Sequence, residues 1–189
     1  VDGLKSGDEA KRLLHELELA QAALVGKNRE LEKANRLILE SIQYARRIQT
    51  AMLPDKNALD GAVRDIHVCW EPLHLVGGDY FWLERFGHQS LLVVIDCTGH
   101  GVPGAFMTLV VASALDRILH EKRLLKPSAI LAELDEMVRV RLRQDQPDSD
   151  SDDGLEAGIC LWDAKAGTVT FAGAGLPLLF AGAGQVEEL

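Results

Sequence analysis

Two aspartates, each flanked by glycines at the edge of an apolar strand, are the residues best suited to chemistry. Asp79 follows Val76-Gly77-Gly78, and Asp96 is followed by Cys97-Thr98-Gly99. An ionised carboxylate beside an apolar strand is costly unless it is paired or binds a cation, and glycines permit tight turns and close approach of a charged ligand. If the two strand ends are adjacent, these carboxylates and nearby carbonyls can bind hard divalent cations such as Mg²⁺ or Mn²⁺.

The same residues also allow a purely structural interpretation. The Gly-Gly-Asp segment is typical of a hairpin turn, and Asp96 is a suitable cap for a helix that follows it. The residue pattern alone leaves the metal-binding and structural interpretations open.

The elements that position these aspartates follow from the residue periodicity after residue 59. We expect an acidic, solvated loop over residues 145–156, and helices over 102–121 and 128–143, with Ser128 as the N-cap of the second. We expect strands over 66–72, 80–86, 89–97, 155–163, 168–172 and 178–181. This order predicts an α+β layered domain with mostly antiparallel sheets.

Residues 1–54 show a different, helical pattern and form a predicted N-terminal helical linker ahead of a domain over 59–189. A seven-residue spacing relates six positions, Leu17, Leu24, Leu31, Ile38, Ala45 and Met52. This repeat predicts a two-chain coiled coil, because a helix of ~49 residues, ~75 Å long, exceeds the diameter of one such domain. A single amphipathic helix packed on its own domain is the alternative.

Composition excludes several function classes. The formal net charge of −9 argues against nucleic-acid binding and against a polybasic membrane contact by this chain. No apolar run approaches the ~18 residues of a membrane span. The three cysteines, Cys69, Cys97 and Cys160, lack CxxC spacing, which argues against a disulfide framework or a thiolate zinc site. We therefore expect a cytoplasmic location, either free or as the cytoplasmic part of a membrane-tethered parent.

Two segments carry a family resemblance. Residues 75–82 (LVGGDYFW) and 94–107 (VIDCTGHGVPGAFM) resemble the SpoIIE/RsbU branch of the PPM-type serine/threonine protein phosphatases, in the variant of its SiaA-like members. Residues 41–54 are similar to the helix that leads into these domains, and the similarity extends to about residue 181. The resemblance implies two mostly antiparallel β-sheets sandwiched between helices, with a two-metal Mg²⁺ or Mn²⁺ site at one edge.

The resemblance also implies roles for four residues. Asp79 and Asp96 are expected metal ligands, with Asp96 bridging and catalytic, and Cys97 is expected to contribute its backbone carbonyl. His100 is expected either to protonate the leaving oxygen or to hold the turn. The family usually carries a further acidic ligand in a later Asp-Gly turn, which does not occur before Leu189. Either the sequence is a fragment, with the domain over 59–189 truncated at its C-terminus, or the metal site lacks a carboxylate. We therefore expect poor or absent turnover by this chain alone.

The function implied is metal-dependent hydrolysis of phosphoserine or phosphothreonine on a signalling partner protein, of which a STAS-type, anti-anti-sigma-like protein is the expected example. The N-terminal helix would form a homodimer and regulate the phosphatase, with residues 41–53 as the switch segment. The alternative is a catalytically weak or inactive signal-relay module that binds a partner through the same fold. A nucleotide-binding α/β protein is disfavoured, because no P-loop or GxGxxG follows a strand.

Overall fold

The computed structural model of the chain describes residues 2–55, 66–146, 148–149, 151–182 and 184–189, with side chains from residue 11 onward. It divides into two compact units, residues 1–43 and 44–189. The predicted turn around residues 54–61 lies largely outside the described residues. The predicted domain limits of 1–54 and 59–189 stay a prediction.

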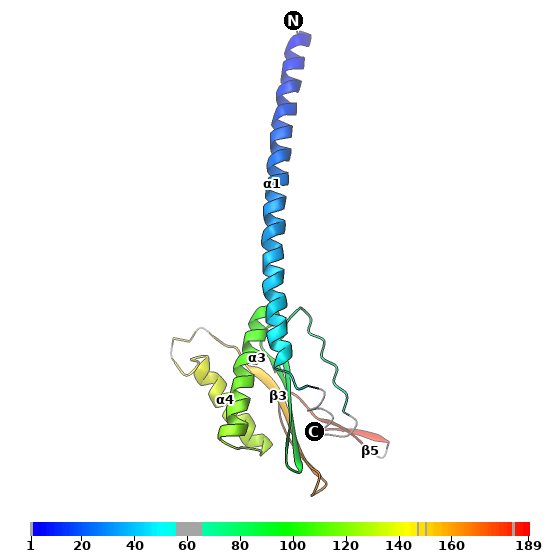
Figure 1. The fold of residues 1–189 in the computed structure, drawn as a ribbon, viewed down its shortest axis with the longest axis vertical. Helices are drawn as coiled ribbons and strands as arrows, with labels where there is room; N and C mark the ends of the chain where they lie inside the picture. Colours follow the sequence, from blue (N-terminus) through cyan, green and yellow to red (C-terminus); the bar gives the residue numbers. More distant parts are fainter. Residues whose placement is uncertain (1, 56–65, 147, 150, 183) are drawn as a thin grey trace. The chain divides into compact units, whose positions relative to one another are not determined.

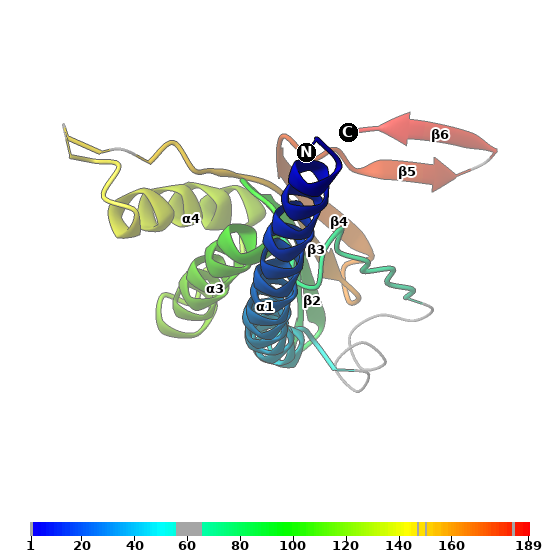
Figure 2. The ribbon, with the colours of Figure 1, turned by 90° about the horizontal axis from the view of Figure 1, so that it is seen from above.

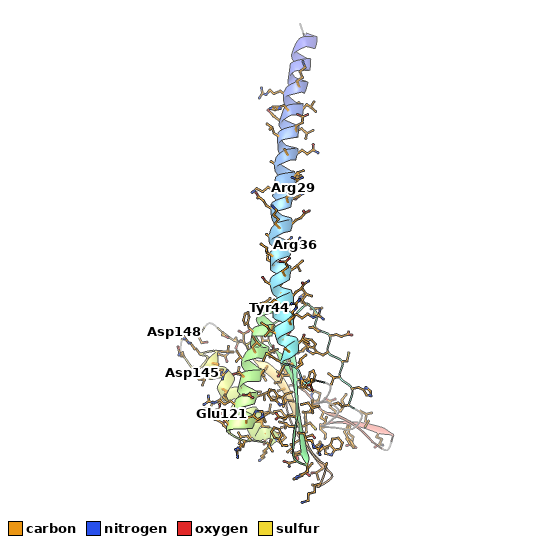
Figure 3. All side chains as sticks on the ribbon, viewed as in Figure 1. Arg29, Arg36, Tyr44, Glu121, Asp145 and Asp148 are labelled. Atoms are coloured by element: carbon orange, nitrogen blue, oxygen red, sulfur yellow. The ribbon has the colours of Figure 1, made fainter. Side chains whose placement is uncertain are left out.

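The first unit is the greater part of one long helix, α1 (Asp2–Ala51) (Figure 1). Side chains such as Arg29 and Arg36 project outward along it (Figure 3). The pair Arg36–Glu40, with 3.0 Å between nitrogen and oxygen, has the four-residue spacing that supports an exposed helix. Seam residues such as Leu24 and Ile38 are 62% and 56% exposed. The predicted helix is confirmed, whereas its pairing with a second chain stays a prediction.

The second unit is built on a four-stranded antiparallel sheet in the order β1-β2-β3-β4. Its strands are β1 (Asp79–Phe86), β2 (Gln89–Cys97), β3 (Leu155–Asp163) and β4 (Thr168–Ala174). A separate hairpin pairs β5 (Leu179–Gly182) with β6 (Gln185–Glu188). The α+β class with antiparallel sheets and a long N-terminal helix is confirmed, although β6 was not predicted.

The strand predicted over 66–72 is wrong. These residues have no regular secondary structure. Both Val68 and Cys69 are exposed, and Ile66 and Trp70 are only partly buried, so the segment adds little apolar surface to the core. The segment is held instead by a side chain, because Trp70 Nε1 donates a hydrogen bond to the Asp79 carbonyl at 3.1 Å.

Two helices, α3 (Gly101–Asp116), continued by a π-helical turn (Arg117–Glu121), and α4 (Pro127–Arg141), cover one face of the sheet (Figure 2). Alternate β2 residues Leu91, Val93 and Ile95 are at most 1% exposed and form the core with these helices. The predicted Ser128 cap is wrong. Lys126 occupies the N-cap and Pro127 begins α4, because the fixed φ of proline suits the first helical position and no N–H is lost there.

The apolar character of α3 comes from this packing. Among the described helices, Gly101–Glu121 alone has the length and apolar character of a possible membrane span: an 18-residue window within it has a mean hydropathy of 1.5, and 56% of that window is buried inside the protein. Core packing against the sheet accounts for that hydropathy.

Candidate metal centre

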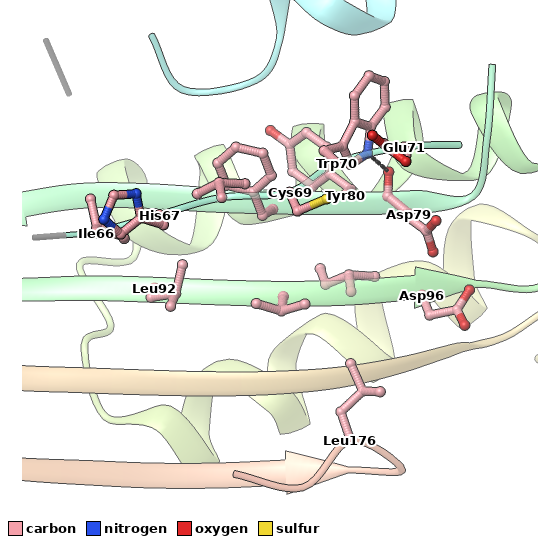
Figure 4. Close-up of a pocket in the computed structure, with 14 residues that line it drawn as sticks. Ile66, His67, Cys69, Trp70, Glu71, Asp79, Tyr80, Leu92, Asp96 and Leu176 are labelled. Atoms are coloured by element: carbon pink, nitrogen blue, oxygen red, sulfur yellow. Dashed lines mark hydrogen bonds between the residues drawn. The ribbon is translucent and has the colours of Figure 1, made fainter. Parts of the chain in front are cut away.

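The first hairpin brings the two predicted aspartates together. The antiparallel register of β1 and β2 places Asp79 directly opposite Asp96, at the open end of the hairpin. Cross-strand partners project from the same face of a sheet, and Figure 4 shows both carboxylates at the same end of the hairpin, where β1 begins and β2 ends. The two carboxyl groups are close enough for a hydrogen bond, which perturbs the ionisation of Asp79.

Burial raises the pKa of Asp79, and the neighbouring negative charge of Asp96 and a hydrogen bond between the two carboxyl groups raise it further. Two carboxylates held side by side repel one another when both are ionised. A cation placed between them would relieve this repulsion. The site is therefore electrostatically suited to bind positive charge.

The structural alternatives for the two aspartates are contradicted. The hairpin turn lies at Gly87–His88, where β1 ends and β2 begins, and the Gly-Gly-Asp segment leads into β1. The N-cap of α3 is His100, and no side chain makes a capping hydrogen bond there. Asp96 belongs to β2 and stabilises no described helix end.

Close backbone packing explains the glycines beside the aspartates. A Cβ on Gly78 would lie 2.7 Å from both the Cys97 and the Gly99 carbonyl oxygens, and a Cβ on Gly104 would lie 2.6 Å from the Gly99 oxygen. The Cys97 N–H also donates a 3.1 Å hydrogen bond to the Gly78 carbonyl. Gly99 has φ 91°, a conformation that glycine adopts without strain. The segments that carry the two aspartates are therefore in direct backbone contact.

The thiol of Cys97 is unsuited to chemistry. Its side chain is 3% exposed, and burial raises the pKa of the thiol to about 12, with smaller contributions from Asp96 and Asp79. A neutral buried thiol is neither a nucleophile nor a good metal ligand. Only the backbone carbonyl of Cys97 remains available for the predicted role.

His100 lies at the mouth of the site with a second histidine. A cavity of ≈ 180 Å³ is lined by residues that include Asp79, Asp96, His100 and His74. The rings of His74 and His100 have centroids 5.0 Å apart. Sequence reasoning missed His74, because its spacing from the other histidines carries no signal and only the fold places it here.

Thr98, next to the candidate ligands, has a structural role. Its N–H donates to the Gly154 carbonyl at 2.9 Å, and its hydroxyl accepts from the Gly154 N–H at 2.9 Å. These two bonds hold the end of the loop before β3 against the strand end that carries Asp96.

A second cavity of ≈ 640 Å³, lined by apolar residues such as Leu92 and Val94, opens beside the two aspartates (Figure 4).

The donor set fits a small hard cation. It comprises two carboxylates with backbone carbonyls close by, all of them oxygen donors of the kind that Mg²⁺ and Mn²⁺ prefer. No group of three or more His, Cys, Asp or Glu side chains within the described ranges is arranged to hold a metal ion. Mg²⁺ usually keeps several waters and needs only one or two carboxylates, so two side chains suffice for one partly hydrated ion.

Comparison with known proteins gives three findings. The family model described as Stage II sporulation protein E (SpoIIE) matches residues 87–189, more than half of the chain. The solved SiaA-PP2C domain of Pseudomonas aeruginosa is 33% identical, with a TM-score of 0.75, over 82% of this chain and 61% of that one. The RsbU and RsbW domains of Rv1364c from Mycobacterium tuberculosis are 24% identical, with a TM-score of 0.44, over 68% of this chain and 32% of that one.

A search of curated proteins found no match. This chain spans 61% of the length of the SiaA-PP2C structure. The family match includes β2, which carries Asp96 and Cys97, and also His100. The structural match extends over most of the chain. Together with the paired aspartates, these matches show that the chain belongs to the SpoIIE family of PPM-type phosphatases.

Proposed function

We propose that the chain is a metal-dependent protein phosphatase domain that hydrolyses phosphoserine or phosphothreonine on a signalling partner protein. The observation that carries the proposal is the Asp79–Asp96 pair, held in register at one sheet end beside close-packed backbone carbonyls. Asp79, Asp96 and the Cys97 carbonyl would hold Mg²⁺ or Mn²⁺. When bound, such cations lower the pKa of a water molecule and neutralise phosphate charge.

The chain's own residues then have defined tasks. Hydrolysis forms a bond from a water oxygen to phosphorus and breaks the phosphorus–oxygen bond to the serine or threonine, whose oxygen must gain a proton. His100 is exposed and lines the same cavity as the two aspartates, so it is the proposed donor of that proton. The His74 ring lies beside it, with the two ring centroids 5.0 Å apart. No protein nucleophile is needed, in agreement with the buried, neutral Cys97 thiol.

The partner is proposed by analogy with the matched proteins. SiaA and RsbU domains are both named in the matched structures, and the family resemblance points to a phosphorylated STAS-type protein as the substrate. The apolar cavity of ≈ 640 Å³ beside the aspartates offers a surface on which such a partner can be held.

The test compares Asp96→Asn with Asp135→Asn, an exposed aspartate on α4 that serves as the charge-matched control. We expect Mn²⁺-dependent release of phosphate from a phosphoserine or phosphothreonine protein by the full-length wild-type protein and by its Asp135→Asn control, poor or no release by residues 1–189 alone, and loss of release in Asp96→Asn. In EDTA, Asp96→Asn should unfold at a higher urea concentration than wild type, because one of two repelling charges is gone. Mn²⁺ at ~100 times its Kd should stabilise only wild type and control, by about 2.7 kcal/mol.

A second candidate function is a catalytically weak or inactive module that binds the partner without turnover. It is favoured by one observation, the lack of a third side-chain ligand near the aspartates among the described residues. Partner binding without phosphate release, in wild type with Mn²⁺ supplied, would support this candidate and overturn the first.

We also propose that α1 forms a homodimer and thereby regulates the phosphatase. The exposed seam through Leu24, Leu31 and Ile38 carries this proposal. Leu31→Asp should shift the chain from dimer to monomer in light scattering. Ala22→Asp adds the same charge on the opposite face and should leave the dimer intact. Equal masses for both variants and wild type would contradict the proposed homodimer.

A further inference from the structure

One buried polar side chain, Gln49 in the last turns of α1, is not used by the proposed chemistry. Gln49 is 2% exposed and is the only buried residue of α1 between residues 11 and 51. It belongs to the same compact unit as the metal centre. A buried amide is retained only where its hydrogen bonds are made, because an unpaired one is costly.

The Gln49 amide bonds both backbone groups of one glycine. Its Nε2 donates to the Gly77 carbonyl at 2.7 Å, and its Oε1 accepts from the Gly77 N–H at 3.3 Å. Nε2 also donates to Thr108 Oγ1 at 3.0 Å, and the Thr108 hydroxyl donates to the Ala105 carbonyl at 2.8 Å. The side chain thus pairs with Gly77 as a neighbouring strand would.

This contact lies two residues from a proposed metal ligand. Gly77 and Gly78 carry no side chains, so only backbone contacts can fix their position ahead of Asp79. On one side, Gly78 packs against the Cys97 and Gly99 carbonyls. On the other side, Gln49 holds Gly77. Tyr80, directly after Asp79, donates from its hydroxyl to the Met52 carbonyl at 3.1 Å.

We infer that Gln49 is a positioning residue for the metal centre, which fixes the Gly77–Gly78 backbone and through it the Asp79 carboxylate opposite Asp96. The inference rests on the proposed function, since it assigns a device that serves the proposed divalent cation. It predicts that loss of the Gln49 amide weakens cation binding even where the protein stays folded.

The experiment measures Mn²⁺ binding to the 189-residue chain by electron paramagnetic resonance of the free ion, with urea unfolding in EDTA as a parallel readout. Gln49→Met keeps the volume and removes all three bonds to the amide. Thr108→Val is the matched control, because it disturbs the same buried cluster but leaves the two Gln49–Gly77 bonds. Gln49→Asn, one methylene shorter, replaces Gln49→Met if circular dichroism shows that variant unfolded.

Both substitutions should lower the urea midpoint, but only Gln49→Met should raise the Kd for Mn²⁺, by about tenfold or more, which is about 1.4 kcal/mol. An unchanged Kd in a folded Gln49 variant, with wild type binding Mn²⁺ normally, would overturn the positioning role and leave the proposed function standing. An equal rise in Thr108→Val would also overturn it, because the effect would then be general loosening. Absence of Mn²⁺ binding by wild type would refute the metal site and this inference together.

Discussion

The close contact of Gly104 with the aspartate-bearing segments gives a sharp prediction for Gly104→Ala. A Cβ at this position would lie 2.6 Å from the Gly99 carbonyl oxygen, 2.9 Å from the Gly78 nitrogen and 3.0 Å from the Gly78 Cα. All three are backbone atoms, which cannot move aside as a flexible side chain can. The substitution must therefore push α3 away from the strand ends or displace the strand ends themselves.

The expected magnitude is the difference of two terms. Overpacking of a close-packed interior costs about 1–3 kcal/mol, and three backbone contacts place Gly104 at the upper end of that range. Alanine in place of glycine inside a helix restores about 1 kcal/mol. The net loss in the free energy of unfolding is therefore about 2 kcal/mol, which lowers the urea midpoint by about 1 M.

Urea unfolding followed by circular dichroism measures this loss, and Gly154→Ala is the control. The nearest atom to a Cβ on Gly154, apart from its chain neighbours, is Thr98 Oγ1 at 3.9 Å, an ordinary contact, so its midpoint should stay near wild type. Gly104→Ala should also weaken Mn²⁺ binding, because the Gly78 and Gly99 backbone must shift. A Gly104→Ala protein as stable as Gly154→Ala, with unchanged Mn²⁺ affinity, would refute the backbone contact as the reason for glycine.

Two further predictions concern titratable side chains. Burial raises the pKa of the Cys97 thiol to about 12. A thiol reagent at neutral pH should therefore label exposed Cys69 and leave Cys97 unmodified until urea unfolds the chain. Rapid labelling of Cys97 in the folded chain would contradict this prediction. A hydrogen bond with Glu84 raises the pKa of His120. The stability it contributes is fully present below the unfolded pKa of about 6.5 and is lost as pH rises through the folded value. Wild type should therefore lose more stability than His120→Gln between about pH 6 and pH 8.5, and parallel losses would argue against this ion pair.

Local sequence pattern was sufficient for most of the secondary structure. The apolar run over 89–97 predicted β2 with its observed bounds, because a buried strand needs an apolar stretch of that length. The strand predicted over 155–163 also matches the bounds of β3. The heptad spacing predicted α1. The predictions of a strand over 66–72 and of Ser128 as a helix cap were wrong. A strand forms at such a position only if the fold buries one of its faces. The cap was displaced because Pro127, one residue before Ser128, begins the helix.

The candidate site, like the secondary structure, was predicted only in part from the sequence. The glycine-flanked aspartates were visible in the sequence because few structural roles require an ionisable side chain at the edge of an apolar strand. Their convergence was predicted through the family resemblance, but the residue pattern alone allowed it only if the two strand ends were adjacent. The fold had to decide this, because a one-residue slip in register would turn Asp79 away from Asp96. The proximity of His74 to His100 is likewise a result of the fold.

The sequence by itself determined which residues could bind a cation and most of the segments that would be helix or strand, since these depend on residue type and short-range periodicity. Only the tertiary structure decided that Gln49 reaches Gly77, 28 residues away, and Thr108, 59 residues away. Such contacts leave no periodic trace in the chain. They arise because core packing buries one turn of α1, and a buried amide must then find its hydrogen-bond partners wherever the fold has placed them.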